Sequence, residues 1–383
     1  MSILTKAAES LQSLHIHYAS EQRDRGIYCS ETLATALSEF QSLTKFQFEF
    51  ESYFDDNNVS NANKILDAAA QLPDLKRLEL RNPPPSVQGA RRQEFLFDTF
   101  VALRFLRIGY GSGSGCKEVF RRYQFPALVD LAIAPNFSES SNLAELIAAI
   151  ASSCHPHTLA SITIKPHVDI MTQNILFPHG ILRPLLGFPK IEKLVVDDPK
   201  CALLDDTEID LISSAWPALR VLSVHDAAPR LAALNKDIKV TLQGLQALLE
   251  RCPRLEGLGL VLEATVDLLP EKPALPLNKR VTALELSNSP VIDPRRVARV
   301  LATMLPRLNA IHYQPMFNIG VSPMASGITG KKIFQRWTET EKMIRELRNV
   351  SVKQEATVKQ EVTVKQEATV KQEATVKQEA GSQ

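Results

Sequence analysis

Apolar residues recur along this chain in a fixed order: one, a second three positions later, and a third two positions after that. The clearest copy is Leu75, Leu78 and Leu80. The first apolar residues of all eleven copies are Leu11, Leu43, Leu75, Leu103, Leu128, Leu159, Ile191, Leu219, Leu255, Val281 and Leu308. The steps between them range from 25 residues (103 to 128) to 36 residues (219 to 255). Such a period predicts a solenoid, in which stacked units bury an apolar face that one unit cannot bury alone.

Each copy predicts a short strand. In six copies a proline stands two residues before the first apolar residue, as Pro73 does before Leu75. Proline cannot continue a helix, so it ends the preceding helix and biases the chain toward extended geometry. Leu78 and Leu80 alternate, which places them on one face of the strand. The opposite face then carries Arg77, Glu79 and Arg81.

Helix signals lie between the strand segments, with apolar residues three and four positions apart. Four of these signals start at a residue type that caps helices: Ser30, Asn142, Thr241 and Asp293. Glu145 follows Asn142 as in a capping box, and Pro294 follows Asp293 at the first helical position. Each unit therefore predicts strand, turn and helix, and residues 1–315 predict one α/β solenoid of about eleven repeats.

The repeat stops after Tyr313. Residues 316–350 predict a loop followed by an amphipathic helix from Lys331 to Asn349. The apolar side of this helix would hold Ile333, Trp337, Ile344 and Leu347. A solenoid needs its exposed last repeat covered, so we expect a capping helix; the alternative is a helix that binds a partner.

Residues 351–383 repeat the hexad V-K-Q-E-A-T five times with small changes. A six-residue step turns a helix by about 600°, so successive valines point in different directions and no apolar stripe forms. We expect a disordered, low-complexity tail. Each Val-Lys-Gln-Glu segment resembles the consensus for SUMO conjugation, and the alternative is a neutral repeat expansion. The candidate acceptors are Lys353, Lys359, Lys365, Lys371 and Lys377.

Composition and charge narrow the class of protein. The chain has 383 residues, 44% of them hydrophobic, and a net charge of +1, so neither nucleic acid nor a membrane is expected as the main partner. The start lacks the apolar core of a signal peptide, and no run approaches the ~20 residues of a membrane span. The five cysteines form no C-x-x-C pair, which favours reduced thiols and a cytoplasmic or nuclear location. They are Cys29, Cys116, Cys154, Cys201 and Cys252.

No motif points to catalysis. The glycine run from Gly109 to Gly115 stands between a strand and a helix, as a phosphate loop would, but Cys116 separates it from Lys117 and the G-x-x-x-x-G-K pattern is not met. An inter-repeat loop is the simpler interpretation. Two histidine pairs, at 15 and 17 and at 155 and 157, have no further metal ligands nearby in sequence. We therefore predict a non-enzymatic protein without metal or cofactor.

The eleven copies resemble leucine-rich repeats, and the strand–turn–helix units resemble the ribonuclease-inhibitor type. The resemblance implies parallel strands on the concave side of a solenoid and helices on the convex side. The family usually places Asn or Cys three residues after the last apolar residue of the motif. Here Asn136 fits, but the equivalent positions elsewhere hold Glu51, Pro83, Pro199 and Ala227.

Phe-Pro, Trp-Pro and Cys-Pro before the strands look like those of fungal F-box proteins with leucine-rich repeats. In that family the F-box binds a Skp-type adaptor in a cullin ubiquitin ligase, and the solenoid recruits the substrate. The opening Leu-Pro and helical hairpin of an F-box are not found here. The resemblance thus implies a protein–protein interaction scaffold, with a substrate receptor as its specific form. A nuclear scaffold regulated by SUMO conjugation on the tail is the alternative. We expect a monomer.

The candidate partner-binding residues lie on the expected concave face of repeats two to four. They combine long charged side chains with an exposed aromatic one, a composition typical of interface anchors, although an ordinary solvated face has the same pattern. The candidates are Lys45, Glu49, Arg77, Glu79, Arg81, Phe105 and Arg107. Later repeats offer mainly small residues at these places, such as Ala132, Ala134, Gly257, Gly259 and Ala283.

Overall fold

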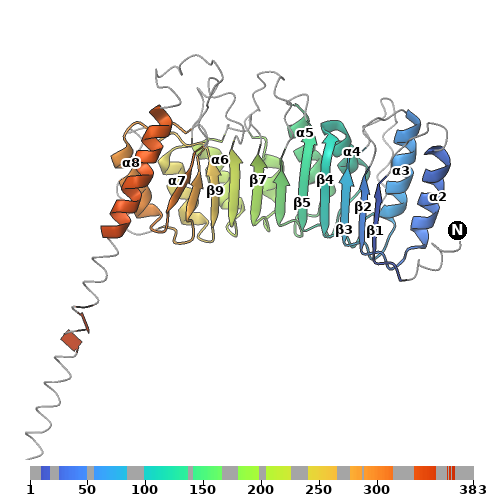
Figure 1. Cartoon of the computed structure of the whole chain (residues 1–383), viewed down its shortest axis with the longest axis horizontal. Helices are drawn as coiled ribbons and strands as arrows, with labels where there is room; N and C mark the ends of the chain where they lie inside the picture. Colours follow the sequence, from blue (N-terminus) through green and yellow to red (C-terminus); the bar gives the residue numbers. More distant parts are fainter. Residues whose placement is uncertain are drawn as a thin grey trace, which may run out of the picture.

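A computed structural model gives the fold of the chain. It describes residues 10–17, 26–49, 56–83, 99–136, 141–165, 180–197, 204–225, 240–264, 277–286, 289–313 and 332–350, and five residues between 360 and 366. Figure 1 shows strands standing side by side in sequence order, with helices along one face of the row. The loop expected before the C-terminal helix and nearly all of the expected tail lie outside the described residues.

Eleven strands form one sheet in the order of the sequence, and every neighbouring pair is parallel. Each strand begins two residues after the first apolar residue of a sequence copy, so all eleven predicted strands are confirmed. The strands are β1 (Ser13–His17), β2 (Lys45–Glu49), β3 (Arg77–Arg81), β4 (Phe105–Ser112), β5 (Asp130–Asn136), β6 (Ser161–Ile164), β7 (Lys193–Asp197), β8 (Val221–His225), β9 (Gly257–Leu260), β10 (Ala283–Glu285) and β11 (Ala310–His312).

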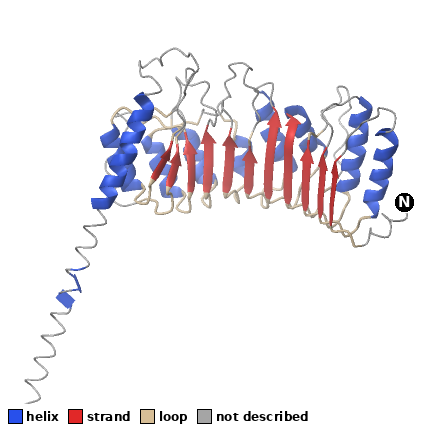
Figure 2. Cartoon of the chain, in the orientation of Figure 1, coloured by secondary structure: helices blue, strands red, loops and turns tan. Residues whose placement is uncertain are grey.

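The connections carry α2 (Gly26–Glu39), α3 (Asp56–Ala70), α4 (Gly113–Arg122), α5 (Ser141–Ser153), the 3₁₀ helix η1 (Arg183–Gly187), α6 (Asp206–Ala215), α7 (Leu242–Arg251) and α8 (Pro294–Met304). A further helix covers residues 332–350. Figure 2 shows that the helices cover only one face of the open sheet. This is the predicted α/β solenoid of leucine-rich-repeat type.

The core lies between the sheet and the helices. The two later apolar residues of each copy point into it: Leu78 and Leu80 are buried on β3, and Leu106 and Ile108 are buried on β4. Leu78 lies in register with Leu106, so equivalent side chains of successive repeats stack in rows. Burial of a row of this kind is the main stabilising contribution of each repeat interface.

Backbone hydrogen bonds join successive repeats at the N-terminal ends of the strands. The carbonyl of Thr44 accepts from the amides of Lys76 and Arg77 at 2.9 and 3.0 Å, and the carbonyl of Lys76 accepts from Arg104 and Phe105 at 2.9 and 3.0 Å. The same double acceptance recurs at Arg104, Val129, Ala160, Glu192, Arg220 and Thr282. Main-chain groups thus join the turns ahead of the strands, whereas the family places its Asn or Cys after them, and Asn136, at such a place, is exposed.

Two of the four predicted helix starts are confirmed. The Thr241 side chain accepts from the amides of Gln243 and Gly244, and the Asp293 side chain accepts from the amide of Arg296. The other two predictions were wrong, because each helix begins before the residue that was expected to cap it. Helix α2 already begins at Gly26, ahead of Ser30, and α5 begins at Ser141, so Asn142 lies inside it.

The glycine run is not a loop. Strand β4 continues to Ser112 and α4 starts at Gly113, so the run is divided between a strand and a helix. The Ser112 side chain caps α4 by accepting from the amide of Gly115. Gly111 must lack a side chain, because an added Cβ would lie 2.4 Å from Cδ of Pro83. The expected loop was wrong, and of these glycines Gly111 serves the close approach of two repeats rather than flexibility.

The helix over residues 332–350 packs on the last repeats. Ile333, Trp337 and Ile344 are buried, and Thr340 is buried between them, while Leu347, near the end of the helix, is 37% exposed. The Trp337 indole donates to the carbonyl of Ser289 at 2.8 Å. Within the part of the chain that the structure describes, no helix is long and apolar enough to cross a bilayer.

Candidate functional site

The face of the sheet opposite the helices carries all seven predicted partner-binding residues. We call it the helix-free face; it consists of the alternate strand residues that point away from the core, such as Arg77, Glu79 and Arg81 on β3. Register places Lys45 beside Arg77 and Arg77 beside Phe105, whereas Glu79 lies beside Arg107. Arg77, Arg81, Phe105 and Arg107 are exposed, and Lys45, Glu49 and Glu79 are half-buried.

Most of these charged side chains form ion pairs. Nε of Arg77 lies 2.8 Å from Oε1 of Glu79, and Arg81 lies 3.5 Å from Glu49. His17 also contacts Glu49, at 3.2 Å. Arg107 has no ion pair with another residue that the structure describes. Glu79, its neighbour in register, is engaged by Arg77 instead, which leaves the guanidinium of Arg107 without a carboxylate.

Two hollows open on the helix-free face over β3 to β6. One, of about 360 Å³, is bordered by Arg77, Glu79, Phe105, Arg107, Asp130, Ala132, Ala134, Thr163 and Lys165, with core residues beneath. The other, of about 280 Å³, is bordered by Glu79, Leu80, Arg81, Arg107, Gly109, Tyr110, Ala134 and Lys165. Since they share Glu79, Arg107, Ala134 and Lys165, they adjoin, and we call them together the β3–β6 groove.

Small residues on β5 create the groove. Ala132 lies in register between Arg107 and Thr163, and Ala134 lies beside Gly109. Long side chains on β3 and β4 therefore stand along a floor that lacks them. From the sequence alone, these alanines were not chosen as binding residues, and Asp130, Thr163 and Lys165 were not identified. The signal that would have found them is a small residue aligned between large ones.

Tyr110 was also missed. It is 64% exposed and takes the left-handed backbone conformation with φ of 58°, at a register irregularity between Gly109 and Ser112. A non-glycine residue at positive φ is uncommon and persists where the surroundings impose it. Here the next residue, Gly111, lies so close to Pro83 that an added Cβ would come within 2.4 Å of its Cδ. Phe105 begins β4, and Tyr110 lies near the other end of the same strand.

The C-terminal part of the helix-free face is different. Its outward residues are mostly small, as at Gly257, Gly259 and Ala283. Ser223 donates to Glu285 across β9 at 3.5 Å, and a Cβ on Gly259 would lie 2.7 Å from the Ser223 hydroxyl. Charged side chains that could anchor a partner are therefore concentrated on the N-terminal repeats, as the sequence predicts.

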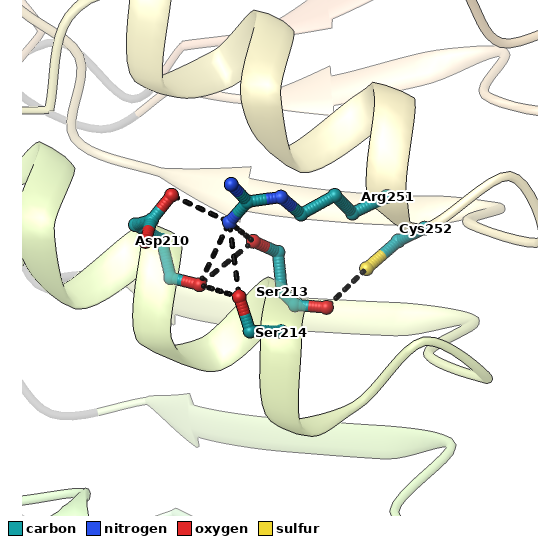
Figure 3. A network of polar contacts seen from close by, with 5 residues as sticks. All are labelled: Asp210, Ser213, Ser214, Arg251 and Cys252. Atoms are coloured by element: carbon teal, nitrogen blue, oxygen red, sulfur yellow. Dashed lines mark hydrogen bonds and ion pairs between the residues drawn. The ribbon is translucent and has the colours of Figure 1, made fainter.

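The best-connected polar cluster on the helical side is structural. Figure 3 shows Arg251 of α7 reaching Asp210, Ser213 and Ser214 of α6. The same guanidinium nitrogen also donates to the Asp210 carbonyl in the middle of α6, at 3.1 Å. This arrangement joins two neighbouring helices.

The described cysteines are buried thiols. Burial raises the pKa of Cys116 and Cys154 to about 12 and that of Cys252 to about 11, the last in spite of the nearby charge of Arg251. Since the thiolate is the reactive form, these side chains are suited to packing rather than chemistry. Cys29 and Cys201 lie outside the residues whose side chains are described.

Other candidate residues are only partly placed. Of the tail lysines, Lys365 is described and exposed, whereas Lys353, Lys359, Lys371 and Lys377 lie outside the described residues. His155 and His157 lie close together with ring centroids 5.6 Å apart. No group of three or more potential metal ligands occurs among the described residues.

No family model matches the chain, and no curated protein matches it. Solved structures do resemble it weakly. The complex of Rad7 and Elc1 in yeast has a TM-score of 0.36 with 16% identity over 76% of each chain. An internalin (inlF) from Listeria monocytogenes has a TM-score of 0.33 with 14% identity over 82% of this chain and 89% of that one. The TLR13–ssRNA13 complex has a TM-score of 0.34 with 16% identity over 73% of this chain and 34% of that one. Similarity this weak assigns neither a family nor a ligand.

Proposed function

We propose that the protein is a non-catalytic protein–protein interaction scaffold that binds its partner on the helix-free face. The observation that carries this proposal is the β3–β6 groove, which lies among residues already predicted to bind a partner. Its border combines an exposed aromatic residue, Phe105, with an arginine, Arg107, and both residue types are enriched among binding anchors.

A long repeat sheet suits this role. Each repeat contributes two or three outward side chains to one continuous surface, and rigid strands hold them in register. A partner can therefore contact several repeats without reordering the chain, which lowers the entropic cost of binding. The charges on repeats two to six then select the partner through complementarity.

The specific form of the proposal follows the resemblance to F-box proteins with leucine-rich repeats. In that form, the helix-free face would hold a substrate for a cullin ubiquitin ligase. A Skp-type adaptor and a cullin would then purify together with the tagged chain. Their absence from the purified material would remove the ligase role and leave the scaffold function standing.

The scaffold function is tested with Arg77→Glu plus Arg107→Glu. The matched control is Arg254→Glu plus Arg307→Glu, which makes the same charge change at exposed turn residues ahead of β9 and β11. Partners identified by mass spectrometry after affinity purification are expected to persist with the control and disappear with the first variant. Both variants should keep the melting temperature within about 2 °C, because surface charges contribute little to stability.

Loss of partners from both variants, or from neither, would contradict binding at this face.

The same purification tests the alternative of a nuclear scaffold regulated by SUMO. Lys365, the tail lysine that the structure describes, is exposed, as an acceptor must be. In that case a ladder of SUMO conjugates would appear, and replacing all five tail lysines with arginine would remove it.

A further inference from the structure

The residues that border the β3–β6 groove change in chemical type along β4. Phe105, which is 44% exposed, borders only the larger hollow, and Tyr110 borders only the smaller one. Arg107 borders both. A ligand that fills both hollows must therefore pass the guanidinium and meet an aromatic ring on each side of it.

The charge at this midpoint is uncompensated. Three other basic residues border the groove, and each has a carboxylate within 4 Å: Arg77 has Glu79, Arg81 has Glu49, and Lys165 has Asp197 at 3.8 Å. Among the described residues, only Arg107 of these four lacks such a pair. A planar guanidinium with free donors fits a carboxylate in a two-point contact.

The charges around the groove disfavour a long polyanion as its ligand. Glu79 and Asp130 both border the larger hollow. A row of phosphates laid along β4 would meet both carboxylates, whereas one carboxylate placed on Arg107 would lie beside Glu79, whose charge Arg77 already pairs. Arg107 has no carboxylate partner among the described residues and lies between two aromatic contacts, which favours a polypeptide that carries a single acidic side chain at that point.

We propose that the groove binds an extended segment of a partner protein in which one Asp or Glu pairs with Arg107 and flanking apolar side chains pack against Phe105 and Tyr110. This inference rests on the proposed scaffold function and names the chemistry of the partner. Ala132 and Ala134 leave the room that the segment fills, since longer side chains at either position would occupy the floor. Arg107 fixes where the acidic residue of the segment lies, and the two rings fix which residues on either side of it are apolar.

The experiment uses a phage-displayed library of random peptides, selected on the immobilised full chain. Selected peptides are expected to share one acidic residue with apolar neighbours. Arg107→Glu should weaken a selected peptide at least about tenfold, and Arg107→Lys should weaken it less, because lysine keeps the charge but loses the two-point contact. Phe105→Ala and Tyr110→Ala should each weaken it, and Arg254→Glu should leave it unchanged.

A charge exchange gives the sharpest result. A selected peptide whose acidic residue is changed to lysine should bind Arg107→Glu better than it binds the wild-type chain. Ala132→Trp, which fills the floor, should abolish binding while the chain keeps its circular dichroism spectrum. A failure of the exchange, or selected peptides without an acidic residue, would overturn the inference.

Two further outcomes separate this inference from the scaffold function. A library that yields no peptide lost by Ala132→Trp, while cellular partners are still lost by Arg77→Glu plus Arg107→Glu, would refute the acidic segment and keep the scaffold. A single-stranded RNA homopolymer that binds in an Arg107-dependent way and displaces the peptides would assign the groove to nucleic acid and overturn both.

Discussion

Two buried tryptophans differ in one hydrogen bond. Trp216 is fully buried at the end of α6, and its indole nitrogen has no hydrogen-bond partner in the described part of the chain. Trp337 is 1% exposed, and its indole donates to the carbonyl of Ser289 at 2.8 Å. Both rings fill the core, so their removal exposes the same apolar area, but only Trp337 also satisfies a polar group.

We expect Trp337→Phe to destabilise the protein more than Trp216→Phe. Both changes remove a similar volume, so the difference reports the hydrogen bond. A buried carbonyl left without its donor costs about 1–3 kcal/mol, whereas loss of an unpaired donor relieves a desolvation penalty. Urea unfolding of the two variants measures the difference directly. Equal midpoints would mean that water or another group replaces the indole at Ser289.

At the scale of elements, strands were predictable and several helix boundaries were not. Strand position follows from the spacing of apolar residues around Leu78 and Leu80, a local signal that each of the eleven copies repeats. Helix starts depend on backbone geometry ahead of the capping residue, which sequence alone does not show. Ser30 has the chemistry of a cap, yet α2 begins at Gly26.

Helices α3 and α4 are joined by a semi-buried ion pair. Asp67 on α3 accepts from Nε of Arg122 at 3.0 Å and from the Tyr123 hydroxyl at 2.8 Å. The contact spans 55 residues of sequence and bypasses the segment 84–98, which the structure leaves undescribed. Burial, followed by the charge of Asp67, raises the pKa of Tyr123 well above its ordinary value, so the hydroxyl remains a donor.

Asp67→Ala should therefore cost about 2–3 kcal/mol of unfolding free energy, because it leaves Arg122 and the buried Tyr123 hydroxyl without their acceptor. The control is Asp210→Ala at the pair in Figure 3. Asp210 and Arg251 are 53% and 44% exposed, and Arg251 keeps its contact with the Asp210 carbonyl, so that loss should stay below about 1 kcal/mol. Chemical denaturation of both variants tests the order; a larger loss for Asp210→Ala would contradict it.

At the scale of the whole molecule, the sequence predicted which face could bind but not where that face is hollow. Arg77, Phe105 and Arg107 were identified because alternation assigns their side chains to the outside of the sheet. The groove depends on register between strands, since Ala132 matters only because it lies beside Arg107 and Thr163. Residues in register lie about thirty positions apart in the sequence. Because the repeats differ in length, these pairs are not evident when each repeat is considered separately.

The stacking of repeats also predicts how the molecule opens. Each strand contacts only its neighbours in the sheet, so a core change should loosen its own region and leave distant repeats closed. Leu284 on β10 and Leu78 on β3 are both fully buried and occupy equivalent places. Leu284→Ala is expected to speed amide exchange in β9 to β11 and to leave β2 to β4 unchanged, and Leu78→Ala should do the reverse.

Hydrogen exchange followed by mass spectrometry resolves these regions in one experiment, and each variant serves as the control for the other. The pattern has a functional consequence, because the groove lies among the N-terminal strands. Leu284→Ala should keep ligand binding there, whereas Leu78→Ala, whose side chain lies in register with Leu106 beneath the groove, should weaken it. Faster exchange throughout the sheet with either variant would show instead that the eleven repeats unfold as one cooperative unit, and recognition would then depend on the stability of every repeat.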